Sequence, residues 1–198
     1  MHASEQDTPR VQALRAAWRQ ACPPLDPQRL VFIDESGLNL ALTRLYGRAP
    51  RGQRVIGSIP QNYGERLTVL AALDRRGIRA ALAVDGPTDG PVFLTFLQRV
   101  LCPRLRPGEV VVLDNLRAHS VPGVAEALAQ VGARVRYLPP YSPDYNPIEF
   151  AWSKVKWLLR ARAARTRTSL QRALGTALQT ITPQNARAWF RHCGYGSH

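Results

Sequence analysis

Two aspartates directly follow short, wholly apolar segments, and they are the residues best placed to do chemistry. Asp34 follows the run Leu-Val-Phe-Ile at 30–33, and Asp114 follows the run Val-Val-Val-Leu at 110–113. Such runs predict strands that are buried on both faces. If the two strands lie side by side and parallel, their backbones are about 4.8 Å apart, and both carboxylates belong to one small site.

A shared site for two carboxylates has a specific chemical consequence. Charges that close repel each other unless one carboxylate is protonated or a cation lies between them. Oxygen ligands without a His or Cys cluster favour Mg²⁺ or Mn²⁺ over zinc. The alternative is that each aspartate only closes its strand by accepting hydrogen bonds from loop amides, and both interpretations stay open at this point.

A third acid, Glu149, lies at the start of a predicted helix over about 147–163. Asn146 suits the N-cap of this helix and Pro147 its first position. Glu149 would then occupy the third position, where it can complete a capping box by bonding to the Asn146 amide. Capping is therefore the simpler role for Glu149 when this segment is considered alone.

The rest of the helix favours a functional role for the same acid. An apolar stripe is formed by Ile148, Trp152, Val155 and Leu159. Glu149, Lys156 and Arg160 lie together on a strip beside this stripe, roughly 100° around the helix. One acid and two bases at the edge of a buried helix could place a metal ligand next to phosphate contacts.

The predicted secondary structure places the acids in one fold. Strands are predicted at 30–33, 53–56, 66–73, 78–84, 110–113 and 135–138. Helices are predicted at 11–20, 92–101, 124–131, 147–163 and 169–181, with a short one after Pro183. Early strands joined as hairpins suit antiparallel pairing, whereas the later alternation of helices and strands suits parallel crossovers. The sequence therefore predicts an α/β fold, a mixed sheet with helices on both faces.

The charge of the chain indicates a polyanionic partner. Its 198 residues include 27 Lys+Arg and 14 Asp+Glu, which gives a formal net charge of +13. Residues 151–198 contain nine basic side chains and no acid, and the acid-free stretch 36–64 contains Arg51 and Arg54. Such a field attracts nucleic acid, although a proteome that prefers arginine would produce a similar surplus.

Composition also argues against several other classes of protein. No apolar run reaches the roughly 18–20 residues that a membrane helix needs, and arginines interrupt any signal-like segment near the N-terminus. The three cysteines are far apart and lack metal-ligand spacing, so neither a disulfide framework nor a zinc site is predicted. We expect a cytoplasmic, nucleoid-associated protein with no membrane partner.

Three segments resemble a DDE transposase of the mariner superfamily, in its bacterial insertion-sequence branch. They are Phe-Ile-Asp-Glu-Ser at 32–36, Leu-Asp-Asn at 113–115 with His119, and Leu-Pro-Pro-Tyr-Ser-Pro-Asp-Tyr-Asn-Pro-Ile-Glu at 138–149. Between Asp114 and Glu149 lie 34 residues, positions 115 to 148, a spacing typical of much of that group. The proline-rich segment is the specific signal, and the resemblance extends over roughly 30–162.

The resemblance implies a ribonuclease H-like catalytic domain, a mixed five-stranded sheet with helices on both faces. Asp34, Asp114 and Glu149 would be its catalytic residues and the ligands of two Mg²⁺ or Mn²⁺ ions, with Asp34 shared between the ions. Two such ions, about 3.5–4 Å apart, can activate a water or a 3′-hydroxyl and stabilise the leaving oxygen of a phosphodiester. The implied activity is metal-dependent cleavage of DNA ends, followed by strand transfer from the freed 3′-OH into target DNA.

Three parts are predicted along the chain. They are a lead-in helix over 1–28, the catalytic domain over 29–163, and a basic helical tail over 164–198 that packs on the same domain. Full-length members of the family carry helix-turn-helix domains ahead of the catalytic one. We therefore expect a separate or frameshift-fused helix-turn-helix part that recognises the transposon ends, and a dimer on double-stranded DNA.

Further basic side chains are candidates for DNA contact. They are Lys154, Lys156, Arg160, Arg51, Arg54 and His119. For His119 a position near the scissile phosphate competes with a plain loop histidine, and for the others a solvated basic face is the alternative. Two other functions stay open: a DNA-binding remnant that has lost catalysis, and a ribonuclease H-like repair nuclease acting on RNA–DNA hybrids or junctions.

Overall fold

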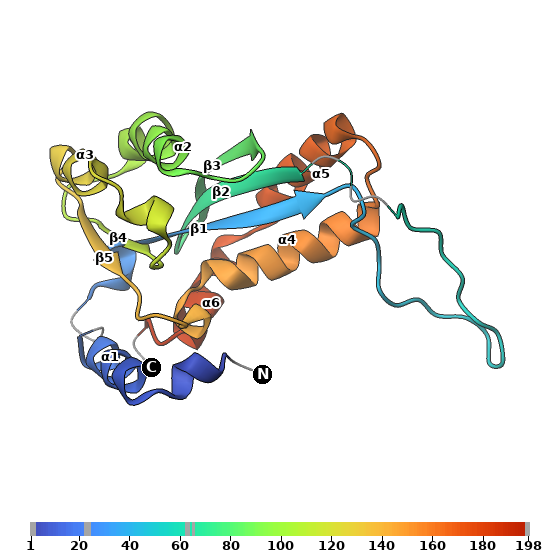
Figure 1. Ribbon diagram of the computed structural model, residues 1–198, viewed down its shortest axis with the longest axis horizontal. Coiled ribbons are helices and arrows are strands. Elements are labelled where there is room, and N and C mark those ends of the chain that lie inside the picture. Colours follow the sequence, from blue (N-terminus) through green and yellow to red (C-terminus); the bar gives the residue numbers. More distant parts are fainter. Residues whose placement is uncertain (1–2, 22–24, 62–63, 65, 197–198) are drawn as a thin grey trace.

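Five strands form one mixed sheet in the computed structural model, which describes residues 3–21, 25–61, 64 and 66–196 (Figure 1). The strands are β1 (Leu30–Asn39), β2 (Arg66–Asp74), β3 (Gly77–Asp85), β4 (Val110–Leu113) and β5 (Arg134–Tyr137). Their order is β3-β2-β1-β4-β5, with antiparallel pairing among β1, β2 and β3 and parallel pairing of β4 with β1 and β5. The predicted combination of hairpin strands and parallel crossovers is confirmed.

Helices cover both faces of this sheet. They are α1 (Pro9–Ala21), α2 (Gly90–Thr95), α3 (Val124–Gln130), α4 (Ile148–Arg162), α5 (Arg167–Gln179) and α6 (Pro183–His192). Helix α2 continues into a π-helical segment at Phe96–Leu101. Short 3₁₀ turns lie at Ser4–Asp7, Pro27–Arg29, Cys102–Arg104, Arg117–Ser120 and Pro143–Tyr145. The predicted helices are confirmed, with ends that differ by a few residues.

Each face of the sheet has its own apolar core, and the alternation along β1 separates the two. Leu30 and Phe32 pack with side chains of α4, α5 and α6, whereas Val31 and Ile33 pack with side chains of α2 and α3. All four are at most 1% exposed. Asp34 continues the first series, so its side chain lies on the α4 face at the end of a row of core residues.

Helix α1 packs against the end of the chain. Trp18 of α1 belongs to the same core as Phe32, and its indole N–H donates to the hydroxyl of Tyr195 at 3.1 Å. The Tyr195 hydroxyl donates in turn to the backbone carbonyl of Tyr145 at 2.8 Å. The N-terminal helix and the C-terminal segment therefore both contribute to holding the loop that precedes α4.

Residues 44–61, named the arm below, project from the body of the molecule between β1 and β2 (Figure 1). The prediction of a strand at 53–56 is wrong, because that segment pairs with no strand in the described residues. The whole arm is exposed, including Tyr46 at 89% and Ile56 at 88%. Away from the sheet its backbone has no ladder to join, so a locally strand-like pattern does not become a strand.

None of the helices in the described residues combines the length and the apolar character that crossing a bilayer requires. Cys102 and Cys193 are free and buried, and Cys22 lies outside the described residues. Burial raises the pKa of the Cys102 thiol, and burial followed by the nearby Asp144 charge raises the pKa of Cys193 to about 12. Neither thiol is therefore a nucleophile near neutral pH.

Candidate active site

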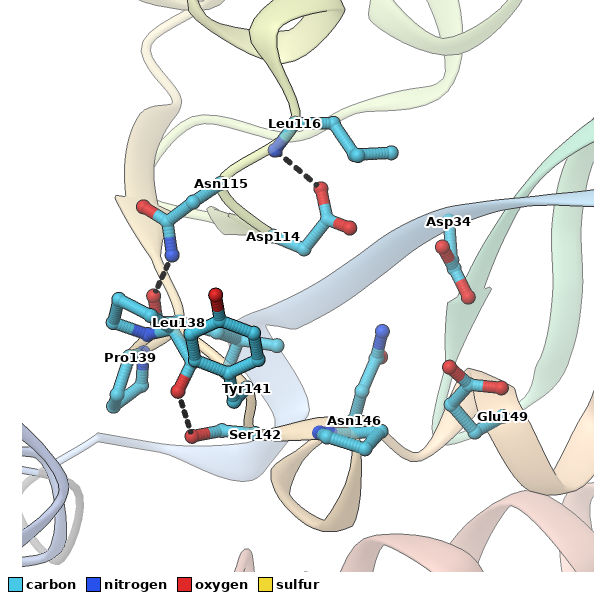
Figure 2. A pocket seen from close by; sticks show the side chains of 12 residues that line it. Asp34, Asp114, Asn115, Leu116, Leu138, Pro139, Tyr141, Ser142, Asn146 and Glu149 are labelled. Carbon is cyan, nitrogen blue, oxygen red and sulfur yellow. Dashed lines mark hydrogen bonds between the residues drawn. The ribbon is translucent and has the colours of Figure 1, made fainter. Parts of the chain in front are cut away.

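The three predicted acids line one cavity of about 440 Å³ (Figure 2). Asp34 reaches it from the middle of β1, Asp114 from the loop after β4, and Glu149 from the first turn of α4. The remaining wall consists of 115–116, 138–143 and Asn146. Carboxylates from three distant segments of the sequence therefore surround one opening.

Asp34 and Asp114 share this site as predicted, but Asp34 does not close its strand. β1 continues to Asn39 because β2 pairs with it throughout, with Asp34 opposite Ala71. β4 ends at Leu113, so Asp114 begins a loop. The parallel register pairs 32 with 112, and two residues further along, the two chain segments reach the aspartates.

Asp34 is the most buried of the three acids, at 7% exposed. Its Oδ2 accepts a hydrogen bond from the indole N–H of Trp152 at 3.1 Å. Burial first, and then the charges of Glu149 and Asp114, raise the pKa of Asp34 to about 7, against the lowering effects of the Glu35 backbone hydrogen bond and the Trp152 bond. A carboxylate in this position is stabilised by a proton or by a cation.

Asp114 accepts hydrogen bonds from two donors, while 36% of its side chain stays exposed. Its Oδ1 accepts from the Leu116 backbone N–H at 3.1 Å and from Nδ1 of His119 at 2.6 Å. The His119 ring has no exposed surface and lies against Phe93, with ring centroids 4.2 Å apart. The predicted DNA contact of His119 is therefore wrong, since a fully buried ring cannot reach a phosphate, and His119 orients Asp114 instead.

Glu149 does not complete the predicted capping box. Helix α4 begins at Ile148 with Pro147 as its N-cap residue, and no side chain caps it in the described part of the chain. The Glu149 carboxylate lies at the exposed rim of the cavity (Figure 2). Partial desolvation raises its pKa, Lys156 lowers it, and Asp114 raises it. This carboxylate is accordingly free to act as a ligand.

The loop 138–146, which leads into α4, is fixed by an ion pair between a buried arginine and a half-exposed aspartate. Arg15 of α1 is 9% exposed and donates to both carboxylate oxygens of Asp144, at 2.9 and 2.6 Å. It also donates to the Ser142 hydroxyl at 2.7 Å. Bidentate pairs of this kind restrict geometry strongly, so α1 sets the position of the loop that carries one wall of the cavity.

Two supporting residues were not predicted from the sequence, although each left a signal. Arg15 lies four residues after Val11 and three before Trp18, the other two buried residues of α1, and an arginine on a buried stripe needs a partner. Trp152 lies on the apolar stripe of its helix, which by itself predicts only a core position. A buried indole N–H also needs an acceptor, and the carboxylate of Asp34 on β1 provides it.

The predicted DNA-contact residues lie in three different settings. Lys156 and Arg160 are partly exposed along α4 on the side of Glu149. Lys154 donates to two oxygens at the junction of α5 and α6, at 2.7 and 2.6 Å. Because these bonds engage the Lys154 ammonium within the protein, we expect it to stabilise this junction rather than to contact DNA. Arg51 and Arg54 are exposed on the arm, away from the cavity (Figure 1).

The donor set suits a divalent cation that prefers oxygen ligands. Among the described residues, no group of three or more His, Cys, Asp and Glu side chains is close enough to hold one ion. Mg²⁺ does not require such a cluster, because it retains water and is bound through one or two carboxylates plus substrate phosphates. The mutual repulsion that raises the pKa of Asp34 favours a cation in the same place.

Comparisons with known proteins agree with this geometry. A family model described as "DDE superfamily endonuclease" matches residues 29–171. A Mos1 transposase paired-end complex with left transposon end has a TM-score of 0.72 at 15% identity, over 98% of this chain and 60% of that one. The Mos1 catalytic domain with raltegravir and Mg has a TM-score of 0.71 at 14% identity, over 98% and 94%. The sequence has no significant match among curated proteins.

A third similar structure is the Mos1 mariner paired-end complex with Mn, with a TM-score of 0.71 at 16% identity, over 98% of this chain and 60% of that one. The chain thus corresponds to nearly all of the isolated Mos1 catalytic domain and to about 60% of the chains in the paired-end complexes. The five-stranded sheet with helices on both faces is the ribonuclease H-like fold of that domain, as predicted.

Proposed function

The chain belongs to the DDE superfamily of endonucleases, and we propose that it is the catalytic domain of an insertion-sequence transposase of the mariner superfamily. Its reaction would be metal-dependent cleavage at transposon ends, followed by strand transfer from the 3′-OH. The observation that carries the proposal is the placement of Asp34, Asp114 and Glu149 around one cavity in this fold.

The chain's own residues prepare the carboxylates for this task. Asp34, Asp114 and Glu149 would hold two Mg²⁺ or Mn²⁺ ions, which when bound supply Lewis-acid activation of the attacking oxygen and neutralise charge on the leaving oxygen. Trp152 and His119 each donate to one aspartate, and such partners fix the orientation of metal ligands.

Double-stranded DNA is the proposed substrate because basic side chains lie on the same helix as Glu149 and on the arm. Lys156 and Arg160 continue along α4 from Glu149, where they would bind phosphates beside the scissile bond. Arg51 and Arg54 on the arm would bind backbone further away. Charge-assisted contacts of this kind position the duplex without reading its sequence.

Recognition of the ends is proposed to need a further part and a second copy. Mos1 transposase is found with transposon-end DNA in paired-end and strand-transfer complexes, and this chain spans about 60% of those chains. By analogy, two copies of this protein would bind DNA as a dimer. A helix-turn-helix part, separate or frameshift-fused, would supply the sequence-specific contacts.

The proposal is tested by nicking of a supercoiled plasmid that carries the DNA flanking the gene, with Mg²⁺ or Mn²⁺. Asp114→Asn is the control, because it keeps the side-chain shape but weakens metal binding. We expect nicking that requires metal and is absent in the variant, and joining of a pre-cut 3′-OH end to a target plasmid.

Other outcomes would support the alternative functions. Salt-sensitive DNA binding without cleavage, even after the helix-turn-helix part is added in trans, would identify a remnant. Preferential cleavage of RNA–DNA hybrids or junctions without end joining would identify a repair nuclease.

A further inference from the structure

Asn146 is buried beside the three carboxylates with an acceptor atom that has no partner. The residue is 3% exposed and lines the cavity, and its Oδ1 makes no hydrogen bond within the described residues. Figure 2 shows the side chain rising from the loop into the space between Asp114 and the pair Asp34 and Glu149, with the amide nitrogen at its tip and the oxygen beside it. A buried polar atom left unpaired costs stability, so its retention requires a reason.

The local backbone does not provide that reason. Asn146 suits an N-cap, but α4 begins at Ile148 with Pro147 as its cap residue and without a side-chain cap bond. The loop bonds the Asn146 backbone: its N–H donates to the Pro143 carbonyl at 3.0 Å, and its carbonyl accepts from the Glu149 N–H at 3.2 Å. Any residue with a backbone N–H could make these bonds, so the amide is available to the cavity.

The neighbours of the amide indicate what it would bind. The charged groups that line the cavity are carboxylates, which share with an amide oxygen the ability to bind a hard divalent cation. An amide adds such an oxygen without a further negative charge. A fourth carboxylate would increase the repulsion that Asp34 already experiences from Glu149 and Asp114.

We propose that Asn146 is a fourth oxygen donor of this site. Rotation of its terminal amide would exchange the positions of nitrogen and oxygen, and Oδ1 would then bind the divalent cation directly or through one water of its hydration shell. The inference rests on the proposed function, because it requires that Asp34, Asp114 and Glu149 bind a divalent cation. It adds a residue that the sequence assigned only to helix capping.

A cation ligand and a structural residue differ in what their removal does. Asn146→Leu keeps the volume and removes the polar atoms. With EDTA we expect its thermal midpoint to be unchanged or a few degrees higher, since an unpaired polar atom is lost. Its affinity for Mn²⁺, measured from the electron paramagnetic resonance signal of free Mn²⁺, should fall about tenfold, in the range expected for partners of a metal site.

Two further variants separate the oxygen from the shape of the side chain. Asn146→Asp returns an acceptor oxygen, so we expect it to restore Mn²⁺ affinity at pH 8 and to lose it more steeply than wild type as the pH falls. Asn185→Leu is the matched control. Its amide oxygen accepts from Lys154 and from the Thr182 N–H, and the residue does not line the cavity. This variant should therefore lower the midpoint and leave Mn²⁺ affinity unchanged.

The outcomes distinguish failure of this inference from failure of the proposed function. Wild type that does not bind Mn²⁺, or binds it as well after Asp114→Asn, would remove the metal site and the inference with it. If Asp114→Asn weakens Mn²⁺ binding but Asn146→Leu does not, the inference about Asn146 is overturned and the proposed function is not. If Asn146→Leu does not fold, the comparison of Asn146→Asp with Asn146→Ala decides: equal affinities would contradict a donor role.

Discussion

Asp34 and Asp114 reach equivalent points on neighbouring parallel strands, yet the protein holds them differently. Asp34 lies inside β1, 7% exposed, between β2 and β4 with one side-chain donor, Trp152. Asp114 lies just beyond β4, with 36% of its side chain exposed and two donors on one oxygen. One carboxylate is desolvated by its strand neighbours, and the other is solvated and oriented by its loop.

The difference arises because β1 is a central strand that continues past its acid, whereas β4 ends before its own. A central position removes water from Asp34, so its charge depends on what else enters the cavity. Asp114 keeps water and hydrogen bonds whether or not a cation is present. Binding a cation should therefore change the energy of Asp34 more than that of Asp114.

Replacing either aspartate by asparagine should abolish nicking but should change stability in different ways. We expect Asp34→Asn and Asp114→Asn each to reduce nicking by about 10³-fold or more, because they act as one unit. In EDTA at pH 8, Asp34→Asn should stabilise the protein by removing a buried charge, whereas Asp114→Asn should not. Denaturant unfolding curves measure this, and equal stability changes in the two variants would contradict the comparison.

The stability of the metal-free protein should fall as the pH rises, because of Asp34. The pKa of this group is about 7 in the folded protein against an ordinary value of 3.8 for aspartate, so the folded state holds the proton more tightly. Stability should decrease between about pH 4 and pH 7, level off above that, and change by roughly 4 kcal/mol in total. Unfolding in EDTA across this range measures the slope, which Asp34→Asn should flatten. Asp114→Asn should keep the slope over a slightly narrower pH range, because the Asp114 charge contributes to the raised pKa of Asp34.

The contributions of His119 and Trp152 to nicking should depend on pH in different ways. His119→Phe keeps the ring beside Phe93 but removes the bond to Asp114, and we expect nicking to fall about 10- to 100-fold at every pH. Trp152→Phe removes a donor that lowers the pKa of Asp34, so its loss of nicking should lessen as the pH rises. Nicking rates from pH 6 to pH 9 test this, and parallel profiles for the two variants would show that Trp152 does not act through the pKa of Asp34.

Local patterns sufficed for the acids but not for their surroundings. The apolar runs before Asp34 and Asp114 predicted that these two acids share one site, and the resemblance carried by the proline-rich segment added Glu149; all three line one cavity. The continuation of β1 through 35–39 depends on its pairing with β2, which is distant in the sequence. The local sequence Ser-Gly-Leu-Asn at 36–39 does not by itself predict a strand.

Side-chain environments were the least predictable feature. His119 is buried because Phe93, from another helix, lies against it, and its own neighbours in sequence do not reveal this. Lys154 and Lys156 are two residues apart on one helix, and only the packing of α5 and α6 on α4 decides that the first is bonded internally. Asn146 fits the sequence rule for an N-cap, but the helix begins two residues later.

Lys154 and Lys156 lie on the helix that carries the third acid, Glu149, and their replacement should have the smallest effect of the changes considered. Lys156 lowers the pKa of Glu149 and stays partly exposed, so Lys156→Met should weaken DNA binding a few-fold and reduce the slope of log K against log salt by about 0.9. Lys154→Met should leave the slope unchanged and lower stability, because it leaves oxygens at the junction of α5 and α6 without their donor. Binding titrations at several salt concentrations, with unfolding curves for both variants, provide the measurement. A lower slope for Lys154→Met, or an unchanged one for Lys156→Met, would show that the phosphates follow a different path from the strip beside Glu149.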